Sequence, residues 1–398
     1  MPASDFLIVG AGILGLATAR ALLRKHPDAR ITVLEKEAAP GRHASGRNSG
    51  VLHSGIFYRP GTWKARFCVQ GAAAMLAFAQ EHGIPWVRAG KLILPTCEAA
   101  DARIPALLEN AKANGVRAEL LDERGILEVE PYARPWRRGV YVPDSVVIDS
   151  PEIVRRLWEF LEARGVRFFF HQRVTAVLDG QASVRTPTER FSFGHLINCA
   201  GAHADVLAHR MGFGLAYRLV PFKGIYFKVR REREGIVRGN LYPVPDPELP
   251  FLGIHFTRDV RGSVSVGPTA IPALGRENYG VVRGMRAGET LRIGWRLARM
   301  YLENGSRFRE RVHAETAKYR PARFLEAARR LVPSLERVDL MRSESVGIRP
   351  QLVDIRTHRL VTDFMIERGD RSTHVLNTIS PGLTCAFPFA EYLVEGLG

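Results

Sequence analysis

The chain has 398 residues, of which 46% are apolar and 25% are charged, a composition typical of a globular protein long enough for two domains. It contains no run of eighteen apolar residues and no C-x-x-C pair among its four cysteines, which disfavours a transmembrane helix, a zinc site and a disulfide framework. The formal net charge is +16, but no helix-turn-helix, zinc-finger or RNP pattern accompanies it, which disfavours nucleic-acid binding. We interpret the charge first as a solubilising surface, and then as steering of acidic substrates or attraction to an anionic membrane.

The first predicted elements are a strand, a tight turn, a helix and a second strand. Residues 5–9 are an apolar run suited to a buried parallel strand, residues 14–25 have the apolar spacing of a helix, and residues 31–34 form the next strand. Because the first strand starts at Asp5, we expect no signal peptide. The four scattered cysteines favour a reducing, cytoplasmic setting. Residues 41–55 are rich in Gly, Ser and Asn and are expected to form a ligand-holding loop.

The remaining elements alternate in a way that splits the first domain along the chain. Further helices are predicted at residues 64–82, 99–115 and 151–165, within the basic stretch 282–335, and at the C-terminus after a Pro-Gly turn. Further strands are predicted at residues 91–94, 166–170, 174–178, 195–199 and 374–379. Residues 218–270 show period-2 alternation with Pro and Gly punctuation, which predicts a β-rich second domain inserted between the pieces of a Rossmann-like first domain.

Three glycines, Gly10, Gly12 and Gly15, form a G-x-G-x-x-G pattern between the first strand and the first helix. In this context Gly10 permits the sharp turn, Gly12 lets the backbone approach a pyrophosphate, and Gly15 lets the helix pack closely on the sheet. The helix N-terminus adds unpaired N–H groups and a partial positive charge. Glu35 ends the second strand, where its carboxylate can accept the ribose hydroxyls of adenosine and disfavours NADP. The alternative, a chance glycine-rich turn with an exposed glutamate, does not explain these features together.

The G-x-G-x-x-G pattern and Glu35, together called the glycine fingerprint here, do not by themselves distinguish an FAD site from an NAD site. The chain holds only one such pattern, whereas a flavoenzyme fed by NAD(P)H would normally carry a second one. A single site therefore favours either an NAD enzyme or a flavoenzyme that takes electrons directly from its substrate.

The loop after Glu35 carries the resemblance that separates them. Residues 41–58 read GRHASGRNSGVLHSGIFY, which resembles the second FAD segment of the D-amino-acid-oxidase-like superfamily. More narrowly, N-S-G-V-x-H-S-G-I-x-Y resembles the L-2-hydroxyglutarate oxidase/dehydrogenase family. Further matches over nearly the whole chain are RFCVQG at 66–71, YPVPDPELPFLGIHFTR at 242–258, the segments 267–270 and 276–279, GIRPQ at 347–351, and Ser380-Pro381. The chain departs from the usual family pattern at Thr269, Asn278 and Gly382-Leu383.

The resemblance implies an α/β protein with a Rossmann-type FAD-binding domain and an inserted antiparallel-β substrate domain that carries helices. The implied FAD-binding domain comprises residues 1–85, 146–212 and 342–398, and the substrate-binding domain comprises 86–145 and 213–341. Non-covalent FAD is expected, although Cys68 or His53 could in principle be attachment points, and no metal is expected. The implied cofactor contacts are Gly10, Gly12, Ile13, Leu14, Gly15, Glu35, Lys36, Ser45, Arg47, Asn48, Ser49, Gly50, Val51, His53, Val174, Ala200, Gly201, Pro381, Gly382, Leu383 and Thr384.

The reaction implied by the resemblance is oxidation of a 2-hydroxy acid, in which a hydride goes to flavin N5 while a base takes the hydroxyl proton. His53 is a candidate base or a hydrogen-bonding neighbour of the flavin ring, and His255 is a candidate base or carboxylate donor, against the alternative of a solvent-facing strand histidine. Arg349 is the candidate for bidentate carboxylate binding, against the alternative of one more surface arginine. Tyr58, Lys223 and Thr384 are weaker substrate-side candidates, and Lys223 alternatively is a solvated strand end.

The start of the last predicted helix and the basic stretch at residues 283–331 are two positively charged features with functional interpretations. Residues 381–384 are predicted to open the last helix, whose N-terminus would stabilise negative charge at the pyrimidine end of the flavin, unless the segment is an ordinary strand-to-helix turn. Residues 283–331 interleave twelve arginines with apolar and aromatic residues. Such a stretch is commonly a solvated face over a small core, but it also suits an anionic membrane surface at which a quinone accepts electrons. The protein would then be peripheral at the inner face of the cytoplasmic membrane.

The leading hypothesis is therefore FAD-dependent oxidation of L-2-hydroxyglutarate to 2-oxoglutarate, with electrons passed to a quinone, another acceptor or oxygen. The alternatives are an amino-acid or amine oxidase, or another 2-hydroxy-acid dehydrogenase, of the same superfamily. A flavin-bearing assembly or RNA-modifying protein that uses its basic surface for binding is a third hypothesis.

Overall fold

The computed structural model describes residues 3–178, 180, 182–246, 252–378 and 380–397. Residues 247–251 of the long predicted motif and Ile379, the last residue of the predicted strand 374–379, lie outside the described residues. The chain divides into two compact units. Unit 1 comprises residues 1–48, 150–221 and 349–398, and unit 2 comprises residues 49–149 and 222–348.

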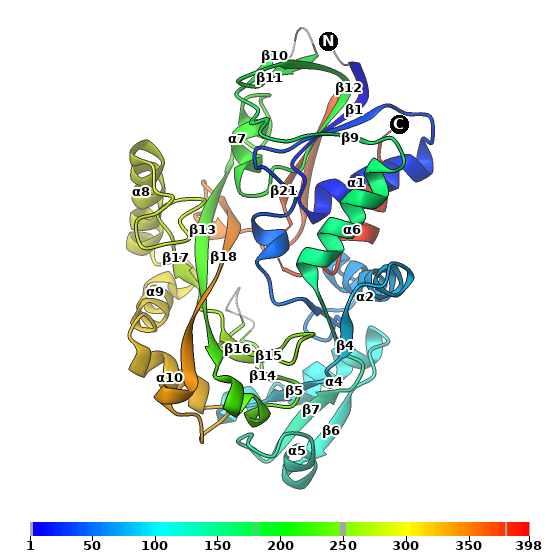
Figure 1. The fold of residues 1–398 in the computed structure, drawn as a ribbon. Helices are drawn as coiled ribbons and strands as arrows, with labels where there is room; N and C mark the ends of the chain where they lie inside the picture. Colours follow the sequence, from blue (N-terminus) through cyan, green and yellow to red (C-terminus); the bar gives the residue numbers. More distant parts are fainter. Residues whose placement is uncertain (1–2, 179, 181, 247–251, 379, 398) are drawn as a thin grey trace. The chain divides into compact units, whose positions relative to one another are not determined.

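Unit 1 is built on a largely parallel sheet with the strand order β10-β11-β12-β1-β2-β9, to which β21 and then β20 are added beside β12 (Figure 1). Strands β1, β2, β9, β12 and β21 pair in parallel, whereas β10, β11 and β20 are antiparallel additions. The strands are β1 (Ala3–Val9), β2 (Ile31–Leu34), β9 (Arg167–Phe169), β10 (Ala176–Leu178), β11 (Ser183–Arg185), β12 (Arg190–Asn198), β20 (Met365–Gly369) and β21 (Ser372–Asn377).

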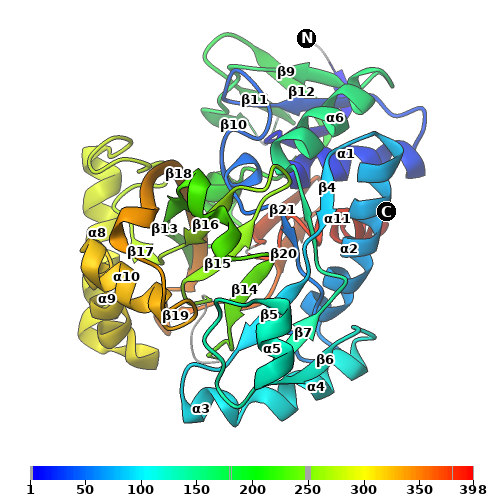
Figure 2. The same cartoon turned by 60° about the horizontal axis from the view of Figure 1, so that its bottom comes forward.

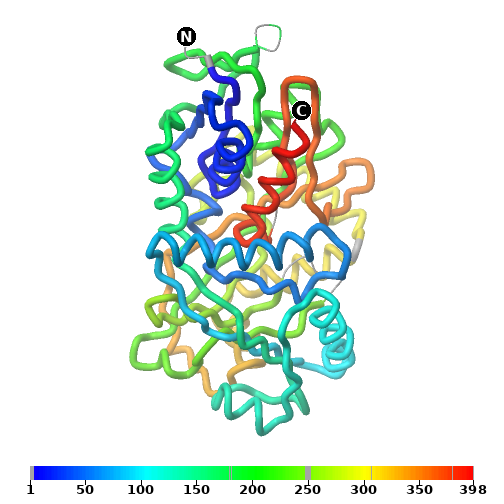
Figure 3. The backbone as a smooth tube through the Cα atoms, turned by 90° about the vertical axis from the view of Figure 1, so that its right-hand side faces the viewer, coloured from blue at the N-terminus to red at the C-terminus, as the bar shows by residue number. Residues whose placement is uncertain are grey.

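Helices cover both faces of this sheet because successive strand residues point to opposite sides. Ile8 of β1 faces α1, where it lies beside Gly15, whereas Leu7 packs with Leu207 of α7 on the other side. Helix α1 also packs against α6 and against the last helix, α11, and Figure 3 shows α1 and α11 side by side although they come from opposite ends of the chain. The helices are α1 (Ile13–Lys25), α6 (Ser150–Glu162), α7 (Ala204–His209) and α11 (Ala386–Glu395).

Unit 2 contains a long, mainly antiparallel sheet with the order β18-β13-β16-β15-β14-β5-β7-β6 (Figure 2). The predicted insertion is thus antiparallel, except that β5 and β14 pair in parallel. The strands of this sheet are β5 (Lys91–Leu94), β6 (Glu119–Asp122), β7 (Arg138–Val142), β13 (Tyr217–Val229), β14 (Asn240–Pro243), β15 (His255–Arg258), β16 (Val264–Gly267), β17 (Ile271–Pro272) beside β13, β18 (Leu340–Asp354) and β19 (Arg359–Leu360) beside β18. Residues 217–221 of β13, residues 349–354 of β18 and the whole of β19 are assigned to unit 1.

The helices of unit 2 cover this sheet and carry the basic region. Leu92 and Phe256 lie in a core with Phe324 of α10 on one face, whereas Ile93 and Tyr242 pack with α4 on the other. The helices are α2 (Trp63–Glu81), α3 (Glu98–Asp101), α4 (Ile104–Ala113), α5 (Glu123–Val129), α8 (Ala287–Glu303), α9 (Phe308–Ala317) and α10 (Pro321–Arg329). No helix among the described residues is both long enough and apolar enough to cross a membrane.

The boundary near residue 49 differs from the domain ranges predicted from the sequence. Residues 49–85, predicted with the FAD-binding domain, are part of unit 2. The reason is strand pairing: β3 (Val51–Leu52) and β4 (Trp86–Arg88) flank β8 (Val146–Ile148) in a small antiparallel sheet, and α2 packs on β8. Residues 213–221, predicted with the substrate domain, belong to unit 1. The ranges of the two functional domains remain a prediction.

Candidate active site

The glycine fingerprint forms a tight turn between β1 and α1 in which side chains have no room. Gly10 has φ of +108°, and a Cβ there would lie 2.5 Å from the carbonyl oxygen of Cys199. A Cβ on Gly15 would lie 1.9 Å from the carbonyl oxygen of Gly10. Both positions therefore require glycine for the protein's own packing.

Gly12 is different because it borders open space. It is the N-cap residue of α1, and a Cβ there would meet only the Ser45 hydroxyl, at 3.1 Å. The first turn of α1 has no side-chain cap from Gly12 and no acidic residue, although the Ile13 N–H donates to Ser45 Oγ over 2.9 Å. A helix N-terminus beside a glycine, with no acidic residue in its first turn, is the arrangement that binds a phosphate group.

Glu35 is held at the end of β2 as the carboxylate beside this turn. It is 8% exposed; its Oε2 accepts the Ala11 N–H over 2.8 Å, and its Oε1 accepts the Glu37 N–H over 2.9 Å. Each carboxylate oxygen has two lone pairs, so the bonds to backbone still leave acceptor capacity for ribose hydroxyls. Lys36 instead pairs with the Glu37 carboxylate, and its Nζ lies 2.7 Å from His43 Nε2.

Other predicted cofactor residues of unit 1 are in short turns. Asn48 donates through Nδ2 to the carbonyls of Ala44 and Ser45, over 3.1 and 2.7 Å, and Arg47 donates to the carbonyl of Arg42. The segment 381–384 forms a turn, and α11 begins at Ala386, so the predicted helix opening at Pro381 was placed too early. The segment makes one helix-like bond, from the Cys385 N–H to the Pro381 carbonyl, but the next N–H, that of Ala386, donates to Leu383 in a tighter turn, so regular helix begins only at Ala386.

The end of β12 is organised by Asn198. Its Oδ1 accepts the Ala200 N–H over 3.2 Å, and its Nδ2 donates to the Ala204 carbonyl over 2.8 Å. This side chain therefore shapes the predicted cofactor residues Ala200 and Gly201. Asn198 Nδ2 also lies 3.2 Å from Nδ1 of His374, whose Nε2 lies 3.0 Å from Ser372 Oγ. The predicted contact Val174 packs in the core on the α7 side of the sheet.

His374 makes the stability of unit 1 depend on pH. Burial, together with the nearby His195, lowers the pKa of His374 to about 4 from the usual 6.5. The unfolded chain therefore binds the proton first, so stability is full above pH 6.5 and falls as the pH drops from 6.5 towards 4. We expect a loss of at most about 3 kcal/mol, since one pKa unit corresponds to 1.36 kcal/mol. Urea unfolding at pH 7.0 and 5.0 tests this, and an equal loss in a His374→Asn variant would contradict it.

The predicted substrate-side residues are divided between the two units: Tyr58, His53, Lys223 and His255 belong to unit 2, whereas Arg349 and Thr384 belong to unit 1. The backbone of the His53 loop is fixed from within unit 2, because the buried Cys68 thiol donates to the His53 carbonyl over 2.9 Å. The Tyr58 carbonyl accepts from Asn114 Nδ2 over 2.9 Å.

Lys223 is engaged by its own unit. Its Nζ donates to Asn278 Oδ1 over 3.0 Å and to the Gly280 carbonyl over 2.6 Å, and the residue is 4% exposed. Burial lowers the pKa of Lys223. The alternative of a solvated strand end is therefore wrong for Lys223, and its substrate role stays a prediction.

His255 presents one defined ring nitrogen for chemistry. Its Nδ1 lies 2.8 Å from the Gly253 carbonyl, which can only accept, so Nδ1 carries the proton and the lone pair of the neutral ring is at Nε2. The imidazole is 4% exposed and stacks on Tyr242, with ring centroids 4.0 Å apart and planes at 19°. His255 therefore points its side chain to the protein interior, and the solvent-facing alternative for this residue is wrong.

A family model described as FAD dependent oxidoreductase matches residues 5–396. The chain belongs to the FAD dependent oxidoreductase family. It is 36% identical to the L-2-hydroxyglutarate dehydrogenase of Salmonella houtenae, covering 98% of this chain and 92% of the relative. It is 33% identical to the mitochondrial L-2-hydroxyglutarate dehydrogenase of Homo sapiens, covering 98% and 88%. The resemblance found in the motifs is thereby confirmed.

Solved structures give the same fold. An L-α-glycerophosphate oxidase from Mycoplasma pneumoniae with FAD bound aligns with a TM-score of 0.78 at 24% identity, covering 100% of this chain and 95% of that one. Glycine oxidase from Geobacillus kaustophilus aligns with a TM-score of 0.73 at 18% identity, with the same coverage. These TM-scores establish a shared fold and confirm the predicted fold class, and the family match confirms the predicted FAD cofactor.

Unit 1 fits the adenosine and pyrophosphate portions of FAD. Gly12 leaves space that a Cβ would fill, the N-terminus of α1 would supply N–H groups and positive charge to the phosphates, and the fixed carboxylate of Glu35 would supply acceptors for a ribose. These three features are local to the β1–α1–β2 segment, which is why the sequence pattern located them.

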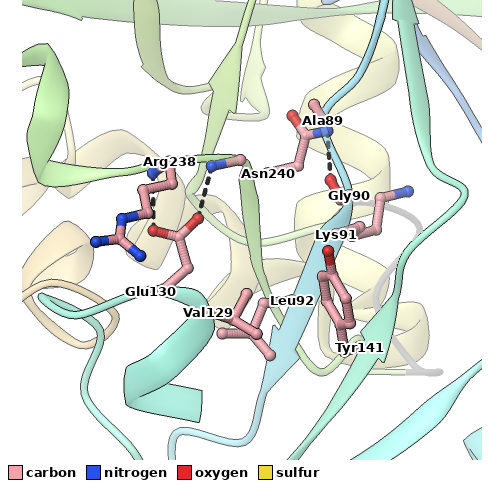
Figure 4. A pocket seen from close by; sticks show the side chains of 10 residues that line it. Ala89, Gly90, Lys91, Leu92, Val129, Glu130, Tyr141, Arg238 and Asn240 are labelled. Carbon is pink, nitrogen blue, oxygen red and sulfur yellow. Dashed lines mark hydrogen bonds between the residues drawn. The ribbon is translucent and has the colours of Figure 1, made fainter. Parts of the chain in front are cut away.

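Sequence reasoning missed Lys91 and the role of Tyr242. Lys91 stands at the start of an apolar strand, where a lysine typically marks a solvated end, but every residue of β5 is buried. Lys91 and Asn240 are among the residues that line a polar pocket, together with Gly90, Glu130 and Arg238, and Figure 4 shows the Lys91 ammonium directed away from Glu130. This pocket contains none of the predicted site residues, and its Glu130 carboxylate accepts the N–H groups of Arg238 and Gly239.

Proposed function

We propose that this chain oxidises L-2-hydroxyglutarate to 2-oxoglutarate. The observation that carries the proposal is the likeness, over 98% of the chain, to relatives that are named L-2-hydroxyglutarate dehydrogenase. FAD, when bound, supplies the acceptor for the hydride that leaves C2 of the substrate. The protein must supply a base for the hydroxyl proton and cations for the carboxylates.

His255 is the proposed base. Its bond to the Gly253 carbonyl keeps the neutral tautomer with Nε2 unprotonated, which is the form that accepts the hydroxyl proton as the C2–H bond breaks. We propose that His53 orients the bound reactants through hydrogen bonds, and that Arg349 holds the carboxylate next to C2 as a bidentate partner. Tyr58, Lys223 and Thr384 are kept as proposed neighbours of the substrate.

Steady-state oxidation with an artificial electron acceptor tests the substrate class. We expect the kcat/KM for L-2-hydroxyglutarate to exceed that for the D enantiomer and for L-2-hydroxyvalerate by about 100-fold or more, since a site built for a charged group strongly rejects an analogue that lacks it. Turnover of glycine or L-proline with a higher kcat/KM would instead favour the amino-acid oxidase alternative.

We further propose that electrons leave to a quinone at an anionic membrane surface that is contacted by α8. Leu291, Trp295 and Leu302 recur at helical spacing and are 73%, 56% and 73% exposed. Ile293 and Met300, on the opposite face, are buried. Helix α8 thus packs with one apolar stripe and presents a second one outward.

The surroundings of the outward stripe suit anionic headgroups. Arg292 and Arg299 flank it, and the Arg299 guanidinium lies 5.1 Å from the centroid of the Trp295 ring. Val281 and Val282, in the loop before α8, are 91% and 73% exposed. Apolar side chains bordered by arginines favour an interface between water and anionic lipid.

Vesicle sedimentation tests the membrane surface. The double variant Trp295→Gln and Leu302→Gln is expected to bind vesicles with one third phosphatidylserine at least about 10-fold more weakly than the unmodified protein, since burying one large apolar side chain contributes roughly 1.5–3 kcal/mol. Binding should also weaken as salt rises from 0.1 to 0.5 M. Leu120→Gln, which replaces a leucine on β6 that is 51% exposed, is the control. Equal vesicle binding by the double variant and the control would contradict the proposal that α8 contacts the membrane.

A further inference from the structure

Lys91 is a buried cation that the fold itself does not neutralise. The residue is 1% exposed, and its Nζ has no hydrogen-bond partner among the residues that the structure describes. Burial lowers the pKa of Lys91 to about 8, a value that still leaves most of the ammonium protonated at pH 7. An ammonium removed from water without a hydrogen-bonded partner is costly for folding, so its presence indicates a use other than stability.

Aromatic rings connect Lys91 to the proposed base. Its Nζ lies 4.9 Å from the centroid of the Tyr242 ring and 5.6 Å from that of Phe57, so the ammonium makes cation–π interactions with both rings. The Tyr242 ring in turn stacks on His255 at 4.0 Å. The separation between Nζ and the His255 ring therefore cannot exceed the sum of these two distances, and all four residues belong to unit 2.

The strand register places two more unsatisfied polar groups in the same cross-strand row. Lys91 on β5 pairs with Asn240 on β14, and the antiparallel pairing of Leu241 with Phe256 places Thr257 opposite Asn240. Asn240 Oδ1 and Thr257 Oγ1 are buried and, within the described part of the chain, have no hydrogen-bond partner. Buried polar atoms are normally bonded, so a row of three points to a ligand or to water that the ligand replaces.

We propose that Lys91 binds the distal carboxylate of the substrate and thereby selects a five-carbon dicarboxylate over a monocarboxylate. This inference rests on the proposed function, and it assigns the second of the two cations that such a substrate needs. The base meets the hydroxyl group on C2, and in a five-carbon diacid C2 lies roughly 4 Å from the distal carboxylate carbon, C5. A hydrogen bond of about 2.8 Å at each end gives a reach close to the limit set by the two ring distances. One molecule can therefore extend from His255 to Lys91.

The surrounding residues have defined parts in this arrangement. The ammonium has three protons, so it can donate to a carboxylate and also to Asn240 Oδ1, while the Thr257 hydroxyl is a further donor on the same face. Tyr242 is a positioning residue, because its ring centroid lies 4.9 Å from the ammonium and 4.0 Å from the centroid of the imidazole that stacks on it. It fixes the spacing between the base and the cation.

Binding of non-reactive analogues to the FAD-loaded protein tests the inference without turnover. Glutarate and pentanoate differ only in the second carboxylate, and flavin absorbance reports the binding of each. We expect the unmodified protein to bind glutarate about 30- to 5,000-fold more tightly than pentanoate, the range for removing one partner of a buried charged pair. In Lys91→Met that preference should fall to less than about 3-fold, with pentanoate binding unchanged. Lys228→Met, which removes an exposed lysine on β13, should retain the preference.

The unfolding temperature of Lys91→Met provides a second readout. If Lys91 served only to stabilise the fold, its replacement would lower that temperature. Methionine has a similar volume and no charge, so Lys91→Met should unfold at the same or a higher temperature than the unmodified protein. Equal weakening of glutarate and pentanoate binding, or an unchanged preference, would overturn the inference. If Lys91→Met does not fold, the unmodified protein still tests the inference. Equal affinity of the unmodified protein for glutarate and pentanoate would overturn the inference.

Different experimental results would refute the role of Lys91 and the proposed function. A protein that prefers glutarate, and loses that preference in Lys91→Met, but does not oxidise L-2-hydroxyglutarate, would retain the dicarboxylate site and refute the proposed substrate. A protein that oxidises L-2-hydroxyglutarate with an intact preference in Lys91→Met would retain the function and refute the role of Lys91.

Discussion

Replacing His255 by asparagine is expected to lower kcat for L-2-hydroxyglutarate by about 100- to 10,000-fold, the usual contribution of a general base. Asparagine can still donate to the Gly253 carbonyl that now holds Nδ1, but it has no basic lone pair at the position of Nε2. FAD should remain bound, because the glycine turn and Glu35 are in unit 1. The measurement is kcat and kcat/KM across pH 5.5–9, together with the flavin content of the purified variant.

The pH profile separates a base from a packing residue. In the unmodified protein the rate should fall at low pH as the base is protonated, and this acid limb should disappear in His255→Asn. His171→Asn is a suitable control, because His171 is exposed and has φ of +58°, a conformation that asparagine tolerates. If His255→Asn retained its rate within 10-fold while His53→Asn lost both the rate and the acid limb, the base would be His53 and our assignment would be wrong.

Replacing Gly12 by alanine is expected to weaken FAD binding by about 10- to 100-fold while leaving the fold intact. Inside the protein the new methyl group would meet only the Ser45 hydroxyl, at 3.1 Å. In the predicted cofactor site this is the space where the backbone approaches the pyrophosphate, and overpacking of this kind costs about 1–3 kcal/mol. The measurement is FAD affinity of the deflavinated protein by fluorescence titration, with thermal unfolding recorded in parallel.

Two other glycine-to-alanine variants serve as controls for Gly12→Ala, one expected to lower stability and one expected to change neither stability nor FAD affinity. Gly15→Ala should destabilise the protein itself, because its Cβ would lie 1.9 Å from the Gly10 carbonyl oxygen. Gly294→Ala on α8 meets no atom within 4 Å and should leave both FAD affinity and unfolding unchanged or slightly improved. Unaltered FAD affinity in Gly12→Ala would place the pyrophosphate elsewhere.

The part of the site that could be predicted from the sequence is the part that depends on local geometry. The fingerprint, the helix that follows it and Glu35 lie in one strand–helix–strand segment, and the structure joins them through bonds such as that from the Ala11 N–H to Glu35. Residue type and spacing are sufficient there because few other conformations satisfy a glycine turn before a helix.

Pairing between distant strands determines the features that the sequence did not reveal. Lys91 is buried because β5 pairs with β14, which comes about 150 residues later in the chain, and no local pattern indicates that neighbour. The stacking of Tyr242 on His255 follows from the pairing of β14 with β15. The assignment of residues 49–85 to unit 2 depends in the same way on β8, which pairs with both β3 and β4.

Anaerobic mixing of the purified, FAD-loaded protein with one equivalent of substrate tests the central claim most directly. We expect L-2-hydroxyglutarate to bleach the flavin absorbance and to yield one equivalent of 2-oxoglutarate per FAD, whereas D-2-hydroxyglutarate, L-2-hydroxyvalerate and amino acids leave the flavin oxidised over the same time. A flavin that stays oxidised with L-2-hydroxyglutarate, or that is bleached faster by an amino acid, would contradict the proposed function.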